Sequence, residues 1–139
     1  MSRSIVIDTS VLSHFFRKSG PSKHLQDWYQ SVLAESLLIS TVTRYEMIAG
    51  LAMLPNRKIL EDFEAFIDDS GIVEVPVSPL IANIAGLARA DLRKAGKTHH
   101  VQDLLIGATA KAIKEPHVCI ATANIKDFDV WGIEIVNPI

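Results

Sequence analysis

The feature that most constrains this chain is a short apolar run that ends at an acid. Ile5, Val6 and Ile7 follow one another and stop at Asp8. A continuous run of branched apolar residues is typical of a strand buried on both faces inside a parallel sheet. In open α/β sheets the ligand crevice lies outside the carboxyl ends of the strands. The sequence therefore places Asp8 at the working edge of a sheet, although an acid in this position also caps helices.

Further strands are expected along the chain, and helical patterns separate them. These strands are expected at 37–40, 72–77, 117–122 and 132–136. Strands that alternate with helices predict an α/β fold, here a three-layer α/β/α sandwich with a mostly parallel central sheet of about five strands. Because the sequence contains no repeat, low-complexity segment or long linker, we expect a single domain over residues 1–139.

Composition excludes several classes of protein. Nearly half of the residues are hydrophobic, which is typical of a globular chain, and the one cysteine, Cys119, cannot form an intrachain disulfide. No apolar stretch approaches the ~20 residues that a membrane span needs, and Asp8 interrupts any signal-peptide layout, so we expect a cytoplasmic protein. The net charge of −2 provides no general attraction to nucleic acid. A polyanionic substrate would therefore need a metal ion or a local basic surface.

Three further acids lie beside predicted strand ends or at a predicted helix start. Glu46 follows the strand at 37–40, Asp127 follows the strand at 117–122, and Asp103 stands in the first turn of a helix that leads into the latter strand. Each also has a structural explanation. Thr43 and Glu46 fit a capping box, and the helix dipole stabilises an acid in the first turn of a helix.

The four acids are expected to meet, because the carboxyl ends of parallel strands share one edge of the sheet. Clustered carboxylates repel one another unless a cation lies between them. Ligand sets made only of oxygen favour Mg²⁺ or Mn²⁺ over zinc. Such an ion activates a water molecule and neutralises charge on a phosphoryl group, so the chemistry implied is phosphodiester hydrolysis.

A basic segment precedes Asp103. It contains Arg89, Arg93, Lys94 and Lys97, followed by the pair His99–His100. Cations suit the C-terminal end of a helix, which is one explanation, and phosphate binding is the alternative. The adjacent histidines lack the further, suitably spaced ligands of a zinc site, so we interpret them as a loop beside the acidic site.

Four motifs resemble, in order, those of a PIN domain, and within that superfamily those of the VapC-type toxin ribonucleases of type II toxin–antitoxin pairs. They are Ile7–Ser10 (IDTS), Thr43–Glu46 (TRYE), Asp103–Ala110 (DLLIGATA) and Ala121–Phe128 (ATANIKDF). The resemblance covers essentially the whole chain. It implies a Mg²⁺- or Mn²⁺-dependent endoribonuclease that hydrolyses RNA phosphodiester bonds. It also implies a homodimer and inhibition by a cognate antitoxin protein.

The same resemblance assigns the site residues. Asp8, Glu46 and Asp103 match acidic positions of the family. The fourth position stays open, because many relatives have an acid where this chain has Asn124, while Asp127 follows three residues later. We therefore expect Asp8, Glu46, Asp103 and Asp127 to be catalytic, and the same four with Asn124 to be candidate metal ligands. The hydroxyls of Ser10 and Thr122 are expected to orient these carboxylates.

Two other classes of function remain open. One is a catalytically inactive PIN-like module that binds RNA or protein. The other is a different α/β phosphohydrolase with an acidic site, although a haloacid-type phosphatase would have a second aspartate where this chain has Ser10.

The helix pair around Pro55 predicts where an antitoxin binds. Its apolar residues Leu51, Leu54, Ile59 and Phe63 form a stripe of the kind that usually faces a core, and the alternative is that one core face does not need them all. Any exposed part of them would form a groove for an amphipathic partner helix. An Arg or Lys from that partner could then pair with the acidic site in place of the metal.

Overall fold

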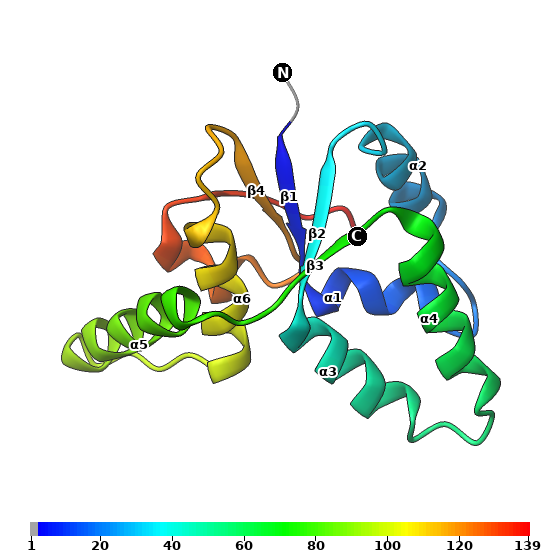
Figure 1. Ribbon diagram of the computed structural model, residues 1–139, viewed down its shortest axis with the longest axis horizontal. Coiled ribbons are helices and arrows are strands. Elements are labelled where there is room, and N and C mark those ends of the chain that lie inside the picture. Colours follow the sequence, from blue (N-terminus) through cyan, green and yellow to red (C-terminus); the bar gives the residue numbers. More distant parts are fainter. Residues whose placement is uncertain (1–2) are drawn as a thin grey trace.

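Five parallel strands form the centre of the structure, a computed structural model that describes residues 3–139 (Figure 1). The strands are β1 (Ser4–Ile7), β2 (Ser36–Ser40), β3 (Val73–Val75), β4 (Val118–Ala121) and β5 (Glu134–Val136). Their order in the sheet is β3-β2-β1-β4-β5, and every neighbouring pair is parallel. The predicted α/β class with a mostly parallel sheet of about five strands is thus confirmed.

Helices connect the strands and cover both faces of the sheet. The α-helices are α1 (Thr9–Leu12), α2 (Lys23–Ser31), α3 (Thr41–Leu51), α4 (Lys58–Ser70), α5 (Pro79–Lys94) and α6 (Val101–Ala112). Short 3₁₀ turns follow α1 as η1 (Ser13–Phe16) and precede β5 as η2 (Ile125–Asp127) and η3 (Asp129–Trp131). Within the described residues, no helix has the length and apolar character that crossing a membrane requires.

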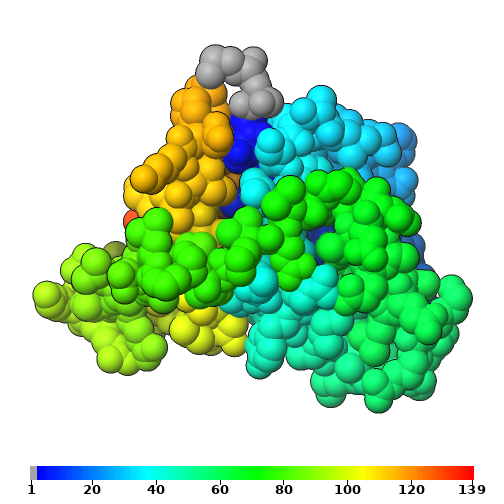
Figure 2. All heavy atoms as spheres, in the orientation of Figure 1, coloured from blue at the N-terminus to red at the C-terminus, as the bar shows by residue number. Residues whose placement is uncertain are grey.

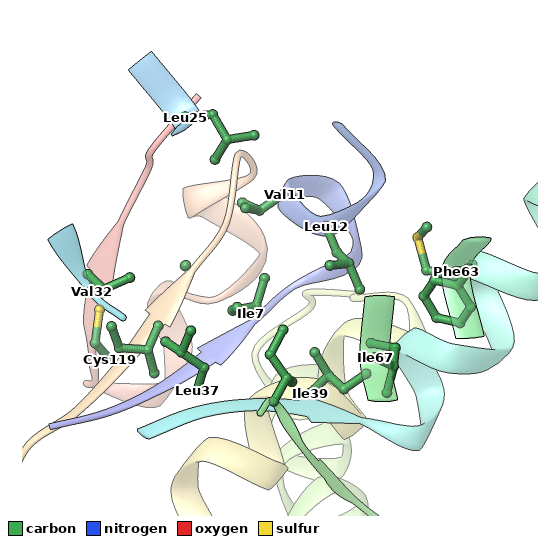
Figure 3. Packing of buried hydrophobic residues seen from close by; sticks show 14 of the residues in the cluster. Ile7, Val11, Leu12, Leu25, Val32, Leu37, Ile39, Phe63, Ile67 and Cys119 are labelled. Atoms are coloured by element: carbon green, nitrogen blue, oxygen red, sulfur yellow. The ribbon is translucent and has the colours of Figure 1, made fainter. Parts of the chain in front are cut away.

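The side chains of β1 alternate between two cores. Ile5 and Ile7 pack in a core with α1, α2 and α4, and Val6 packs in a second core with α5 and α6. Figure 3 shows the first core, in which Ile7 lies among residues of β2, α1 and α4. This alternation explains why β1 is apolar at every position, since a strand covered on both faces has no solvent-facing side.

Cys119 on β4 belongs to the first core (Figure 3). Its side chain is fully buried, and this burial raises the pKa of the thiol to about 11. The residue therefore packs as a small apolar side chain, as expected from its apolar surroundings in the sequence.

The start of α3 corrects one structural explanation from the sequence. The helix begins one turn earlier than a capping box at Thr43 requires, because Ser40 is its N-cap and accepts a hydrogen bond from the Val42 N–H at 3.0 Å. Thr43 is buried inside the helix. The predicted capping box with Glu46 is therefore wrong, and Glu46 has no capping role at this helix.

Candidate active site

The site forms where the order of the strands reverses. From β1 the chain adds β2 and β3 on one side, whereas β4 and β5 lie on the other side. Asp8 directly follows β1, and its N–H donates to the carbonyl of Ala121 at the end of β4. In doubly wound sheets the crevice at such a switch point, outside the carboxyl ends of the strands, is where ligands bind.

Two hydroxyls hold the Asp8 carboxylate, which is almost fully buried. Ser10 Oγ donates to Asp8 Oδ2 at 2.6 Å, and Thr122 Oγ1 donates to the same oxygen at 2.9 Å. The backbone fixes both hydroxyls in turn, since Ala123 N–H donates to Ser10 Oγ and Asn124 N–H donates to Thr122 Oγ1. Both hydroxyls thus use Oδ2, and within residues 3–139 no hydrogen bond reaches Asp8 Oδ1.

A third hydroxyl orients Glu46. Thr9 Oγ1 donates to Glu46 Oε1 at 2.6 Å and lies 3.3 Å from Thr43 Oγ1. Thr9 belongs to the motif at the end of β1, but the sequence pattern does not assign it a role. Its contact joins α1 to α3 across 37 positions, and the only local signal is its place directly after Asp8.

The pKa of Asp103 shows that other acids lie near it. Its pKa is raised to about 6, first by burial and then by the negative charges of Asp127, Asp8 and Glu46, in that order, against a lowering by His100. His100 is the N-cap of α6, so it borders the site as expected. The structure therefore brings Asp8, Glu46 and Asp127 close enough to Asp103 for their charges to oppose its ionisation.

The two candidates for the fourth position differ in their surroundings. Asp127 lies in η2, is partly buried and exerts the largest charge effect on Asp103. Asn124 is exposed, its N–H donates to Thr122 Oγ1, and its carbonyl accepts from the N–H of Asp127.

The donor set suits a hydrated oxygen-seeking ion. The side chains available are four carboxylates with hydroxyls behind them, which is the ligand chemistry of Mg²⁺ and Mn²⁺. In the part of the chain that the structure describes, no group of three or more His, Cys, Asp or Glu side chains lies close enough together to hold a metal ion directly. Mg²⁺ keeps several waters and binds through one or two carboxylates, so these acids could hold it partly through water.

A groove leads away from Glu46 between η1 and the helices α3 and α4. One part, of about 400 Å³, is lined by residues that include Glu46, Leu51 and Leu54. An adjoining part, of about 480 Å³, is lined by residues that include Leu54, Ile59 and Arg17. Of the predicted apolar stripe, Leu51 and Phe63 are buried, whereas Leu54 is exposed and Ile59 partly so. The groove therefore offers an apolar wall that ends at an acid.

Fold and site together define a doubly wound α/β protein with a buried acid, Asp8, at its switch point and further acids near it. A family model described as the PIN domain matches residues 5–129, and the chain belongs to this family. The resemblance seen in the four sequence motifs is thus confirmed.

Several curated proteins and solved structures are similar to this chain over nearly its whole length. The chain is 29% identical to the plasmid stability protein StbB of Pseudomonas syringae pv. tomato over 96% of this chain and 97% of that one. It is also 29% identical to the VapC ribonuclease Y4jK of Sinorhizobium fredii, with 96% of each chain covered. FitAcB from Neisseria gonorrhoeae superposes with a TM-score of 0.78 at 26% identity, over 96% of this chain and 97% of that chain. The DNA-bound VapBC from Salmonella typhimurium shares the fold over the full length of both chains, with a TM-score of 0.83 at 21% identity.

Proposed function

We propose that this chain is a divalent-metal-dependent endoribonuclease, a hydrolase of RNA phosphodiester bonds that acts as the toxin of a toxin–antitoxin pair. The observation that carries the proposal is the charge effect of Asp127, Asp8 and Glu46 on Asp103, beside the switch point at the end of β1. The relatives support the biological role, since they include a VapC ribonuclease and the toxin FitB. The chain would act as a single domain in the cytoplasm, where its RNA substrates are.

The chain's own residues would prepare the site as follows. Ser10 and Thr122 occupy Oδ2 of Asp8 and so aim Oδ1 at the pocket, while Thr9 fixes the rotamer of Glu46. Asp103 and Asp127 complete the negative surface, with Asp127 preferred over Asn124 because its charge acts most on Asp103. Bound Mg²⁺ or Mn²⁺ would supply an activated water and neutralise charge on the phosphoryl group.

The groove beside Glu46 is the proposed binding site for the antitoxin. An amphipathic helix would lay its apolar face over Leu54 and Ile59, because these are the exposed part of the groove wall. Glu46 lines the same groove, so an Arg or Lys at the end of that helix could pair with the acids. Inhibition would combine blocked access with loss of the charge that holds the metal.

A homodimer is the proposed assembly, as the resemblance implies. Leu80 and Leu87 are both exposed and stand seven residues apart on α5, which places them on one face of that helix. Such an unpaired apolar stripe suits contact with a second copy of the chain.

The test is cleavage of total RNA by the purified chain, free of any partner, with and without Mg²⁺. We expect cuts only with the metal, and a rate at least about 100-fold lower for Asp8→Asn, since one misplaced charge-stabilising group typically costs this much. Asp69→Asn is the matched control, because it removes an exposed carboxylate on α4 and should cleave like the wild type. Intact RNA under all conditions would indicate an inactive module. Release of phosphate from small esters with RNA left intact would indicate a different phosphohydrolase.

A further inference from the structure

We propose that Arg89, Arg93 and Lys97 form a cleft that binds the phosphate backbone of single-stranded RNA beside the acidic site. This inference rests on the proposed function and adds how the substrate is held. We call the site the basic cleft. It lies at the corner between α5 and α6 and is lined by Arg89, Leu92, Arg93, Lys97, Thr98, His99 and Leu104.

The backbone builds the basic cleft in a fixed shape. Gly96 adopts a positive φ of 72°, and the N–H of Lys97 donates to the carbonyl of Leu92 at 2.8 Å. This turn ends α5 and folds the chain back, so Lys97 stands beside Arg93. Leu92 and Leu104 close the base of a small cavity of about 50 Å³. The cleft thus has an apolar floor and a cationic rim, and Arg89, Arg93 and Lys97 are exposed to solvent.

The charges of the basic cleft have no structural partner. Residues 89–100 contain four basic residues and one acid, a net of +3, so the rest of a chain of net −2 carries −5. Among residues 3–139, no salt bridge includes Arg89, Arg93, Lys94 or Lys97. Arg89 and Arg93 are like charges at i and i+4, an arrangement that destabilises a helix. The helix dipole explains Arg93 and Lys94 in the last turn, but Arg89 lies beyond its reach.

The basic cleft adjoins the acidic site through α6. Leu104 in the floor of the cleft directly follows Asp103, and His100 at the start of the helix acts on the charge of Asp103. A strand whose phosphate occupies the cleft would therefore have a neighbouring phosphodiester near the acids. Figure 2 shows the lime-coloured end of α5 at the rim of the molecule, open to solvent.

RNA backbone is the occupant that this chemistry favours. Guanidinium groups bind phosphate through two parallel hydrogen bonds, and a row of such cations matches a run of phosphates. The acidic pocket by itself repels a polyanion, so a nuclease of this charge needs cations beside its site. The apolar stripe of α5 does not compete for this surface, because Arg89 and Arg93 lie about 200° and 240° around the helix from Leu87.

The test measures binding without cleavage. A fluorescein-labelled, random-sequence single-stranded RNA of about 20 nucleotides is titrated with the full chain in EDTA at several salt concentrations. We expect Arg93→Glu/Lys97→Glu to weaken binding at least tenfold at low salt. The slope of log K against log salt should fall by about 1.4, because each lost phosphate contact on a single strand removes about 0.7. Arg93→Gln/Lys97→Gln, which adds no negative charge, should show the same loss of slope.

The control is Lys23→Glu/Lys114→Glu, which changes the net charge equally at exposed positions away from the basic cleft. It should weaken binding less than about twofold, and circular dichroism should show all variants folded. If Arg93→Glu/Lys97→Glu and Lys23→Glu/Lys114→Glu weaken RNA binding equally, the proposal of the basic cleft is wrong. It is also wrong if neither variant weakens RNA binding, even where the wild type cleaves RNA. Weaker antitoxin binding with unchanged RNA binding would assign the cleft to the partner instead. Wild type that neither binds nor cuts RNA would refute the proposed function as well.

Discussion

Among the acids of the site, Asp103 has a pKa that its surroundings clearly raise. Its pKa is about 6 in the folded chain, against 3.8 ordinarily, because of burial and the charges of Asp127, Asp8 and Glu46. A raised carboxyl pKa means that the folded state favours the protonated form. Ionisation therefore lowers the stability of the folded state as pH rises from about 4 to about 6, and the full penalty is present above that range.

Asp103→Asn should consequently stabilise the metal-free chain at neutral pH. We expect the free energy of unfolding at pH 7.5 to rise by about 1 kcal/mol, a figure discounted for solvent screening, and the gain to vanish near pH 4. Urea denaturation in EDTA at both pH values measures this. Asp69→Asn should show no such pH-dependent gain, and a gain for Asp103→Asn that is equal at both pH values would contradict the electrostatic explanation.

Among the residues of the site, the acids were easier to predict from the sequence than the side chains that contact them. Asp8 and Asp103 could be placed because each stands at the boundary of an apolar element. Thr9 could not be linked to Glu46, since that hydrogen bond depends on how α1 packs against α3. Likewise, the proposed choice of Asp127 over Asn124 rests on burial and on the charge effect on Asp103, neither of which the sequence gives.

Helix α6 packs against Trp131 through a residue that has no side chain. A Cβ at Gly107 would lie 2.6 Å from Cδ1 and 2.5 Å from Cε2 of the Trp131 indole, which is closer than real contacts allow. We expect Gly107→Ala to lower the free energy of unfolding by about 1–3 kcal/mol, because the steric cost exceeds the gain in helix propensity.

Gly86 in α5 provides the matched comparison for this prediction. Apart from the adjoining residues and the backbone of α5 itself, no described atom lies within 4 Å of a Cβ built there, so Gly86→Ala should raise stability by about 0.5–1 kcal/mol. Thermal denaturation of both variants measures the difference. If both substitutions stabilise the chain, the packing of Trp131 on Gly107 is wrong.

The groove between η1 and α4 supports a prediction about the antitoxin. Leu54 lines both parts of the groove and is 44% exposed, whereas its neighbour Met53 is 85% exposed and lines neither. Burial of a leucine side chain is worth about 1.5–3 kcal/mol. Leu54→Glu should therefore weaken binding of the antitoxin encoded beside this gene at least tenfold, without change in RNA cleavage by the free chain.

Calorimetric titration with that antitoxin checks this prediction. Met53→Glu introduces the same charge one position away and should bind like the wild type. Unchanged affinity for Leu54→Glu would eliminate the groove as the docking site, though not the ribonuclease.

Elements were predictable where their signals are local. Periodicity and breakers located the strands and helices, whereas the start of α3 was misjudged because Thr43 with Glu46 and Ser40 offer competing caps. The choice depends on where β2 ends, and this is set by its pairing with β1 and β3.

The whole molecule presents an apolar stripe on α5 that its own core does not cover. Leu87 is 70% exposed, and its substitution by Glu should convert the proposed dimer to a monomer in sedimentation velocity. Leu33→Glu changes an exposed leucine beyond the end of α2 and should leave the dimer intact. A dimer that persists in Leu87→Glu would move the interface elsewhere.

The order of the strands was the part of the architecture least accessible from the sequence. Alternating elements predict a parallel sheet, but they do not state that β4 adds next to β1 and not next to β3. The position of β4 beside β1 creates the switch point, and it brings Thr122 into hydrogen-bond contact with Asp8.

The contact between Asp8 and Thr122 has a consequence for the chain during its synthesis. It spans 114 positions, so Asp8 acquires its second hydroxyl only after nearly the whole chain has left the ribosome. Pairings this distant in sequence form late, because a long loop must close first. A nascent chain that ends before β4 has Asp8, Glu46 and Asp103 but lacks both Thr122 and Asp127. Under the proposed function, unfinished copies would thus lack part of the site, and the ribosome would be spared a half-made product that cuts the RNA being translated.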